Sequence, residues 1–198
     1  MGSIKSQPVY RSLSRVPGAK HHVFASAGEG AISVKQVLED LALNELSLAV
    51  LHWEIPATGN RYAALLENEF GAPLEVFPTE AGLMGALAEK LAQSPAGTVL
   101  YLSGPEQFIW KAAALGRSAG MSRAQMQAEL RGSRARRVYC VHCKAINEGV
   151  THSIHRCAGC GLPLCVRDHY SRLMEAYAGF RIDAEEPGNV PEAEELYA

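Results

Sequence analysis

The 198-residue sequence is informative first for what it lacks. It contains no apolar run of about eighteen residues, so no segment has the length of a transmembrane helix. The first residues, 1–22, lack the apolar core of a signal peptide, and we therefore expect a cytoplasmic protein. The net charge is −2, a value that favours neither a nucleic acid nor an anionic membrane as partner.

Familiar catalytic motifs are also missing. The sequence has no Gly-x-Ser-x-Gly, no His-Glu-x-x-His and no Walker-type segment. Its one dense group of reactive side chains is a set of cysteines that the spacing assigns to a metal. We therefore expect no catalytic residue, and no independent catalysis by this chain.

Length and composition predict two domains. With 47% hydrophobic residues, the chain can bury one substantial core and a small satellite. We expect an α/β domain over residues 1–130, a metal-binding domain over 131–180 and an acidic tail over 181–198. The tail contains several Glu and Pro residues and is expected to be an extended arm or a disordered end.

The cysteines form two Cys-x-x-Cys pairs. Cys140 and Cys143 are separated from Cys157 and Cys160 by residues 144–156, a spacer long enough for a short hairpin that brings the pairs together. An odd total of five cysteines and the expected reducing location argue against disulfides. The pattern predicts one site with four thiolate ligands. Cys165 is expected to be a small buried residue.

The ligands alone leave the identity of the metal open. Four thiolates in a tetrahedron suit Zn²⁺, and a rubredoxin-like iron site uses the same ligands and geometry. Zinc is the first choice because it is the commoner occupant of such sites. Nearby histidines are interpreted as surface residues and not as substitute ligands: His142, His152, His155 and His169.

Apolar strand-like segments alternate with helical patterns in the first domain. The expected strands are 22–25, 47–53, 74–77 and 98–102, and the expected helices contain Val34 to Leu41, Tyr62 to Gly71, Leu83 to Leu91 and Phe108 to Leu115. This alternation predicts an α/β fold with a small parallel sheet flanked by helices. After the cysteines, Tyr170, Leu173, Met174 and Tyr177 have helical spacing and predict one more helix.

Two turns are candidates for binding a nucleotide. Gly28 and Gly30 follow the first strand, while Ser103 and Gly104 follow the strand at 98–102. Since ligands of parallel sheets bind at the carboxyl ends of the strands, these turns are expected to flank one crevice. Glycine also serves any tight turn, so the pattern by itself is weak evidence for phosphate binding.

The same turns resemble a known domain. Ala27-Gly28-Glu29-Gly30-Ala31 and Tyr101-Leu102-Ser103-Gly104-Pro105 are similar to the glycine turn and the Cys-Gly-Pro motif of the ferredoxin reductase family's pyridine-nucleotide domain. The chain departs from that family at Ile32, Ser33 and Ser103, and Glu29 would repel a diphosphate. The resemblance implies a degenerate nucleotide domain, without a flavin on this chain.

A second resemblance spans both domains. Five segments are similar to the small subunit family of bacterial dimethylamine monooxygenase: Ile4 to Tyr10, Leu102 to Trp110, Arg136 to Lys144, Cys157 to Gly161 and Val166 to Arg172. The resemblance implies a component of an NADPH- and O₂-dependent oxidative N-demethylase. It also implies three partners, namely a haem subunit, a flavin and [2Fe-2S] reductase subunit and a folate-binding subunit.

Three functions follow for this chain. The first is a non-catalytic subunit in which a structural metal stabilises the small domain. The second is a rubredoxin-like electron-transfer subunit of the same complex. The third, a nucleic-acid-binding zinc ribbon, would use Arg131, Arg134, Arg136 and Arg137. We favour a solvated linker for that basic run, because no aromatic residues are interleaved with it.

Overall fold

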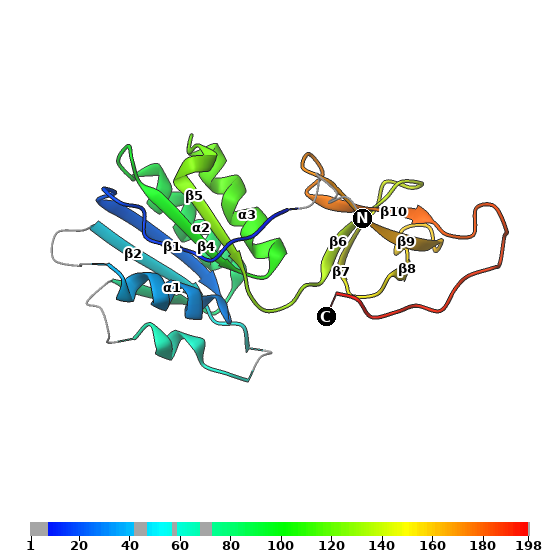
Figure 1. Cartoon of the computed structure of the whole chain (residues 1–198), viewed down its shortest axis with the longest axis horizontal. Helices are drawn as coiled ribbons and strands as arrows, with labels where there is room; N and C mark the ends of the chain where they lie inside the picture. The colour runs from blue at the N-terminus through cyan, green and yellow to red at the C-terminus, as the bar shows by residue number, and fades with distance from the viewer. Residues whose placement is uncertain (1–7, 42–46, 57–58, 68–72, 198) are drawn as a thin grey trace. The chain divides into compact units, whose positions relative to one another are not determined.

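The computed structural model describes residues 8–41, 47–56, 59–67 and 73–197. The chain divides into two compact units, shown in Figure 1. One comprises residues 10–132, and the other comprises residues 133–198 together with residues 1–9.

The N-terminal unit contains a parallel sheet of the order β3-β2-β1-β4-β5. Its strands are β1 His21–Ala27, β2 Ser47–Trp53, β3 Leu74–Phe77, β4 Val99–Gly104 and β5 Met126–Leu130. Its α-helices are α1 Gly30–Glu39, α2 Glu80–Ala92 and α3 Glu106–Ser118, and short 3₁₀ helices span Tyr62–Leu65 and Arg123–Gln125. The α/β class with a parallel sheet is thereby confirmed.

Helices cover both faces of this sheet (Figure 1). On one face, Val34 and Leu38 of α1 pack with Phe24 of β1. On the other face, leucines of α2 and Phe108 of α3 pack on the alternate side chains of β1 and β4. Strand β4 is buried along its whole length, as a strand covered on both faces should be. Of the helix expected at 62–71, the structure describes only the 3₁₀ turn, and residues 68–72 lie outside the described part.

The C-terminal unit is a second five-stranded sheet, of order β7-β6-β10-β9-β8. Its strands are β6 Arg136–Cys140, β7 Ile146–Val150, β8 Ile154–Arg156, β9 Pro163–Ser171 and β10 Ala176–Arg181. The spacer between the cysteine pairs does not form the expected hairpin, because β7 pairs with β6 and β8 pairs with β9. The spacer therefore crosses from one edge of the sheet to the other.

The helix expected after the cysteines is wrong. Residues 163–181 form the antiparallel strands β9 and β10, in which Tyr170 and Tyr177 are cross-strand partners. Their rings meet edge to face with centroids 5.0 Å apart. Residues seven apart can share a helix face, but a tight turn with Glu175 at φ 49° brings the same two residues together across a hairpin.

Arg136 of the basic run and the end of the acidic tail are both held on the C-terminal unit. The Arg136 guanidinium forms a 2.7 Å ion pair with Asp168 and lies between the rings of Tyr177 and Tyr197. The expectation of a solvated linker is therefore wrong at Arg136. Residues 182–188 form turns and bends. Near the end of the tail, the N–H groups of Leu196 and Tyr197 donate to the Thr151 carbonyl at 3.0 and 2.9 Å, so this end is bound to the link between β7 and β8.

Candidate metal centre

The two Cys-x-x-Cys turns have the same backbone hydrogen bonds. The N–H of Cys140 donates to the Ala145 carbonyl at 2.9 Å, and the N–H of Cys157 donates to the Leu162 carbonyl at 3.0 Å. Within each turn, the fourth residue after the first cysteine adopts a left-handed conformation, at φ 69° for Lys144 and φ 72° for Gly161. The turns are therefore equivalent knuckles, although only the second has glycine at this position.

The two knuckles lie close together although their strands do not pair with each other, since β10 lies between β6 and β9. The first knuckle joins β6 to β7 and the second joins β8 to β9. All four cysteine sulfur atoms lie within 4.8 Å of one another, with 3.9 Å between Cys140 and Cys160 and 3.5 Å between Cys143 and Cys157. A tetrahedral zinc with bonds of about 2.3 Å needs sulfur separations of about 3.8 Å. This cluster could therefore hold one metal ion.

The histidines and Cys165, which were not expected to bind the metal, lie outside the four-cysteine group. Among the described residues, the group that could hold a metal contains no histidine and consists of the four cysteines. Cys165 is outside this group and is partly exposed on β9, so the expectation that it is buried is wrong.

Asn147 supports the centre from β7 and is 3% exposed. Its amide nitrogen lies 3.8 Å from the Cys157 sulfur and donates to the Val138 carbonyl, while its oxygen accepts a 2.8 Å hydrogen bond from the Ala158 N–H. The role of Asn147 was not predicted from the sequence. The sequence shows only that position 147 of the spacer is polar, and the fold determines which groups Asn147 contacts.

The environment of the sulfurs differs from one cysteine to the next. Burial acts to raise the pKa of the Cys157 thiol, but hydrogen bonds from the backbone N–H groups of Cys160 and Gly159 and from the side chains of Cys143 and Asn147 outweigh it, and the pKa falls to about 6. Burial raises the pKa of the Cys140 thiol. The lowered pKa favours the thiolate at Cys157, and thiolates are the form that binds metal.

Gly159 makes room for the sulfurs. A Cβ atom at this position would lie 2.7 Å from the Cβ of Ala145 and 3.1 Å from the Cys143 sulfur. Glycine is therefore needed between the two cysteines of the second knuckle.

The candidate nucleotide residues are brought together at the carboxyl ends of the central strands. Gly28 and Gly30 follow β1, and Ser103 and Gly104 end the neighbouring strand β4, where the strand order reverses. All four residues are buried. A Cβ atom on Gly30 would overlap the Ser103 carbonyl, so close packing of α1 against β4 already explains this glycine.

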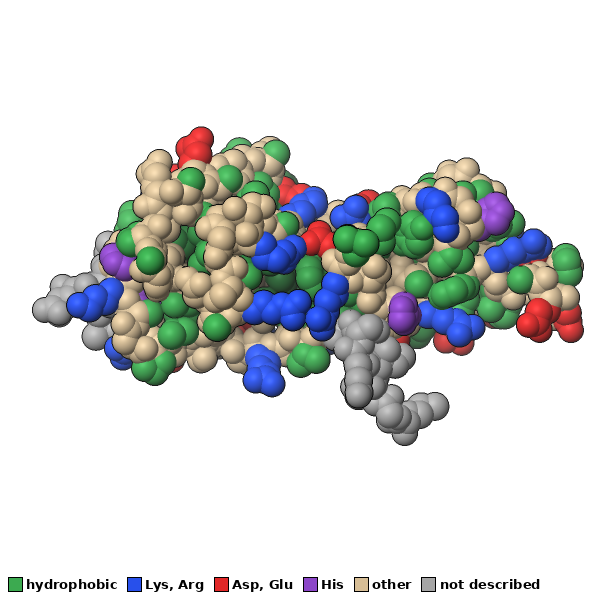
Figure 2. Space-filling model, turned by 90° about the horizontal axis from the view of Figure 1, so that it is seen from above, with side chains coloured by type: hydrophobic (Ala, Val, Ile, Leu, Met, Phe, Trp, Pro, Cys, Tyr) green, Lys and Arg blue, Asp and Glu red, His purple; other side chains and the backbone are tan. Residues whose placement is uncertain are grey.

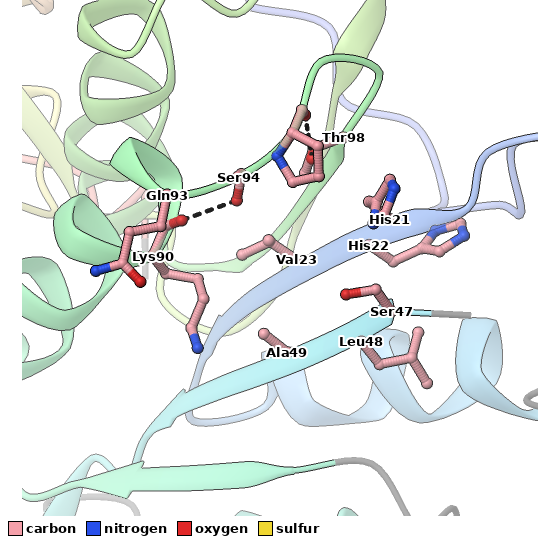
Figure 3. A pocket seen from close by; sticks show the side chains of 11 residues that line it. His21, His22, Val23, Ser47, Leu48, Ala49, Lys90, Gln93, Ser94 and Thr98 are labelled. Carbon is pink, nitrogen blue, oxygen red and sulfur yellow. Dashed lines mark hydrogen bonds between the residues drawn. The ribbon is translucent and has the colours of Figure 1, made fainter. Parts of the chain in front are cut away.

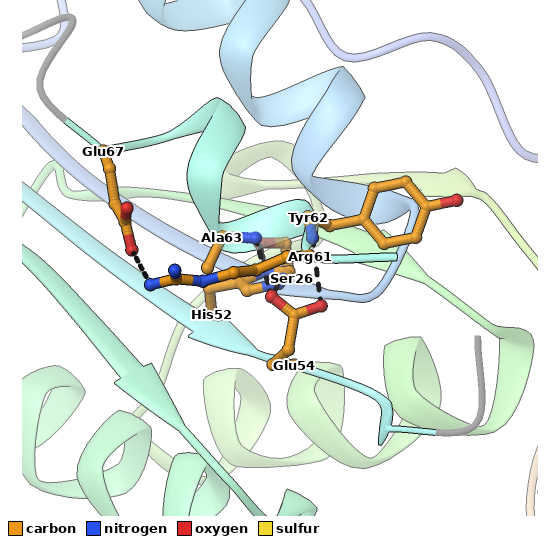
Figure 4. Close-up of polar contacts among 7 residues, drawn as sticks. All are labelled: Ser26, His52, Glu54, Arg61, Tyr62, Ala63 and Glu67. Atoms are coloured by element: carbon orange, nitrogen blue, oxygen red, sulfur yellow. Dashed lines mark hydrogen bonds and ion pairs between the residues drawn. The ribbon is translucent and has the colours of Figure 1, made fainter. Parts of the chain in front are cut away.

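Next to this turn lies a buried polar cluster that was not predicted from the sequence (Figure 4). The Ser26 hydroxyl lies 2.9 Å from Nδ1 of His52, and both side chains are fully buried. Nε2 of His52 has no hydrogen-bond partner and lies 3.7 Å from the Glu54 carboxylate. Burial lowers the pKa of His52 to about 4. The carboxylate of Glu54 accepts hydrogen bonds from the N–H groups of Tyr62 and Ala63 at 3.0 and 2.7 Å.

A small cavity of about 180 Å³ opens at the other end of the same sheet (Figure 3). His21 and Ser47, from the starts of β1 and β2, line one side, and Lys90 of α2 and Ser94, just after that helix, line the other. The Ser94 hydroxyl already donates to the Lys90 carbonyl at 2.8 Å.

No helix in the described part of the chain has the length and apolar character needed to cross a bilayer.

Known proteins similar to this chain were found by sequence and by structure. The chain is 28% identical to the haem-dependent oxidative N-demethylase delta subunit of Ectopseudomonas mendocina (strain ymp), over 92% of this chain and 91% of that protein. An intact type IV self-sufficient cytochrome P450 monooxygenase is similar in structure with a TM-score of 0.47 and 18% identity, covering 68% of this chain and 19% of that one. The FAD/NAD-binding domain of the nitric oxide dioxygenase from Vibrio cholerae has a TM-score of 0.41 and 20% identity, covering 60% and 54%.

Family models match both units. The N-terminal domain of the dimethylamine monooxygenase subunit DmmA-like family matches residues 2–126, and the C-terminal domain of the same family matches residues 137–180. The chain belongs to the dimethylamine monooxygenase subunit DmmA-like family.

Proposed function

We propose that this chain is a non-catalytic, metal-stabilised subunit of a haem-dependent oxidative N-demethylase that acts on secondary methylamines such as dimethylamine with NADPH and O₂. Family membership supports this proposal, as does the similarity to a delta subunit over nearly the whole length of both chains. The partners would be a haem subunit, a flavin and [2Fe-2S] reductase subunit and a folate-binding subunit, in the cytoplasm.

The observation that carries the structural role is the sulfur cluster. Four cysteine sulfurs within 4.8 Å would form a closed site, which leaves no position for water or substrate on the metal. Zn²⁺ bound by Cys140, Cys143, Cys157 and Cys160 would join both edges of a small sheet. Domains of this size seldom fold on core burial alone, so the metal would supply folding free energy directly.

Co-purification tests the assignment to a complex. The full-length chain carrying an affinity tag, expressed in its source organism grown on dimethylamine, should retain the other subunits and the haem absorbance at near-physiological salt. A variant with all four cysteines changed to serine should lose them if the metal-stabilised unit is needed for assembly. Recovery of the wild-type chain alone would contradict the assignment.

An electron-transfer subunit is the second candidate. Cys143 and Cys160, the second cysteine of each knuckle, are partly exposed, so one side of the centre is within reach of a redox partner. Zinc has no accessible redox change, and this function therefore requires iron. An absorption band from thiolate-to-iron charge transfer that bleaches on reduction would favour this candidate over the structural one.

Nucleotide binding at Gly28, Gly30, Ser103 and Gly104 stays a prediction. Packing explains the glycine at position 30, and Glu29 stands where a diphosphate would bind. Calorimetric titration of the full chain with NADPH tests the crevice, and no heat at millimolar concentration would count against it.

A further inference from the structure

One face of the C-terminal sheet carries a continuous row of apolar side chains. Strand pairing places Ile146 of β7 beside Tyr139 of β6, Tyr139 beside Ala178 of β10, Phe180 of β10 beside Cys165 of β9, and Cys165 beside Ile154 of β8. Residues paired in register project from the same face of a sheet, and so do residues two apart in one strand, such as Ala178 and Phe180. These six residues are called the apolar row below.

The apolar row is partly exposed, whereas the opposite face of the same sheet is buried. Phe180 is 39% exposed and the other five residues are partly exposed. The opposite face holds Val138, Cys140 and Leu164, which are all fully buried beside the metal centre. A sheet with one solvated face normally presents polar residues there. A row of apolar residues across every strand therefore marks an interaction surface.

Positive charges surround the apolar row. The Arg167 guanidinium lies 5.4 Å from the ring centroid of Phe180, and the Lys144 ammonium lies 5.5 Å from that of Tyr139. Arg137 projects from the same face and lies 3.3 Å from the Glu148 carboxylate. Among the described residues of these strands, Glu148 is the one carboxylate on this face, so the strands themselves contribute more positive than negative charge to it. Figure 2 shows Lys and Arg side chains interspersed with hydrophobic ones on this unit.

We propose that this face docks an acidic, partly apolar surface of another subunit of the N-demethylase complex; the inference rests on the proposed function. The basic rim would steer an acidic partner, and the apolar row would lose its water on contact. The aliphatic members of the row, such as Ile146 and Ile154, favour a protein over a single-stranded nucleic acid, because bases stack on aromatic rings.

Two single substitutions test the face. Arg167→Glu reverses a rim charge, and Phe180→Glu places a charge in the row. The matched control is Arg123→Glu, which makes the same charge reversal at an exposed position of the N-terminal unit. Each full-length variant is immobilised, and its affinity for the remaining subunits of the complex, purified together from the source organism, is measured at several salt concentrations. Metal content and circular dichroism show whether each variant is folded.

Both face variants should bind at least about tenfold more weakly than the wild type, and wild-type affinity should fall as salt rises. The control should stay within about twofold. Wild-type binding together with unchanged binding of folded Arg167→Glu and Phe180→Glu would overturn the docking face alone. Failure of the wild-type chain to bind would overturn the proposed function as well. Tight, salt-dependent binding of a labelled single-stranded RNA that both face variants lose would overturn the choice of a protein partner.

Discussion

At the scale of single residues, the metal centre depends on the absence of one side chain. The Cβ atom of alanine at position 159 would lie 3.1 Å from the Cys143 sulfur and 2.7 Å from Ala145. We expect Gly159→Ala to weaken metal binding about tenfold, because the sulfurs must separate. Competition with a chromophoric zinc chelator measures the change. Ala158→Ser, at the exposed neighbouring position, is the control. Equal zinc affinities of the Gly159→Ala and Ala158→Ser variants would contradict the claim that a Cβ atom at position 159 crowds the sulfurs.

Asn147 gives a second residue-scale prediction. Asn147→Ala removes the amide that faces the Cys157 sulfur and leaves the Ala158 N–H without its acceptor. Groups that support metal ligands typically contribute 10–100-fold in affinity, so we expect a loss of roughly that size. The same chelator assay detects it. Unchanged affinity would show that Asn147 only fills space.

The first knuckle holds a lysine where the second holds a glycine, and this difference has a measurable consequence. A left-handed conformation costs a side-chain-bearing residue roughly 1–2 kcal/mol relative to glycine. Gly161→Ala should therefore destabilise the C-terminal unit by about that amount, since a Cβ there meets no other atom within 4 Å and only the backbone is strained. Lys144→Gly should be neutral or stabilising. Thermal unfolding of the zinc-loaded chains compares them, and the opposite ranking would be inconsistent with the knuckle geometry.

At the scale of elements, Ser26, His52 and Glu54 connect β1, β2 and the 3₁₀ helix at Tyr62–Leu65. The pKa of His52 is lowered to about 4 by burial, so the folded state binds fewer protons than the unfolded state between pH 4 and 6.5. Stability must therefore fall as the pH falls through this window. From pH 7 to pH 5 we expect the N-terminal unit to lose about 2 kcal/mol from His52.

His52→Gln isolates this contribution. The variant should be less dependent on pH over the same window, although His22, whose pKa is also lowered by burial, adds a slope of the same sign. Urea unfolding followed by tryptophan fluorescence reports on this unit, because both tryptophans of the chain, Trp53 and Trp110, lie in it. Identical slopes for the variant and the wild type would contradict the assignment.

The sequence predicted elements where the evidence was local. Strand β4 and the buried face of α1 were predicted from apolar runs and helical spacing, and the four cysteines from their own spacing. The hairpin of β9 and β10 was not predicted, because Tyr170 and Tyr177 fit a helix face equally well until a turn is placed between them. Asn147 and the Ser26–His52 pair could not be found, since their partners are distant in the sequence and are defined only by the fold.

At the scale of the whole molecule, metal removal should act on one unit only. Chelation of the full chain at neutral pH should unfold residues 133–198 and leave the N-terminal sheet intact, because only the C-terminal sheet depends on the sulfur cluster. Hydrogen exchange should become fast in β6, β9 and β10 and stay slow in β1 and β4. Tryptophan emission should not change. Protection of β6 and β9 in the chelated chain would show that the unit folds without metal.

The folding of the C-terminal unit and the proposed role of this chain both depend on a closed four-thiolate site that holds one zinc. The direct measurement is elemental analysis of the natively purified full-length chain, combined with its visible spectrum and counts of reactive thiols in the native chain before and after a chelator removes the metal. We predict one zinc per chain, no visible absorption and four thiols that react only after the metal is removed. A metal-free chain whose cysteines are joined as disulfides would contradict the account, and a coloured chain containing one iron would replace the structural role with electron transfer.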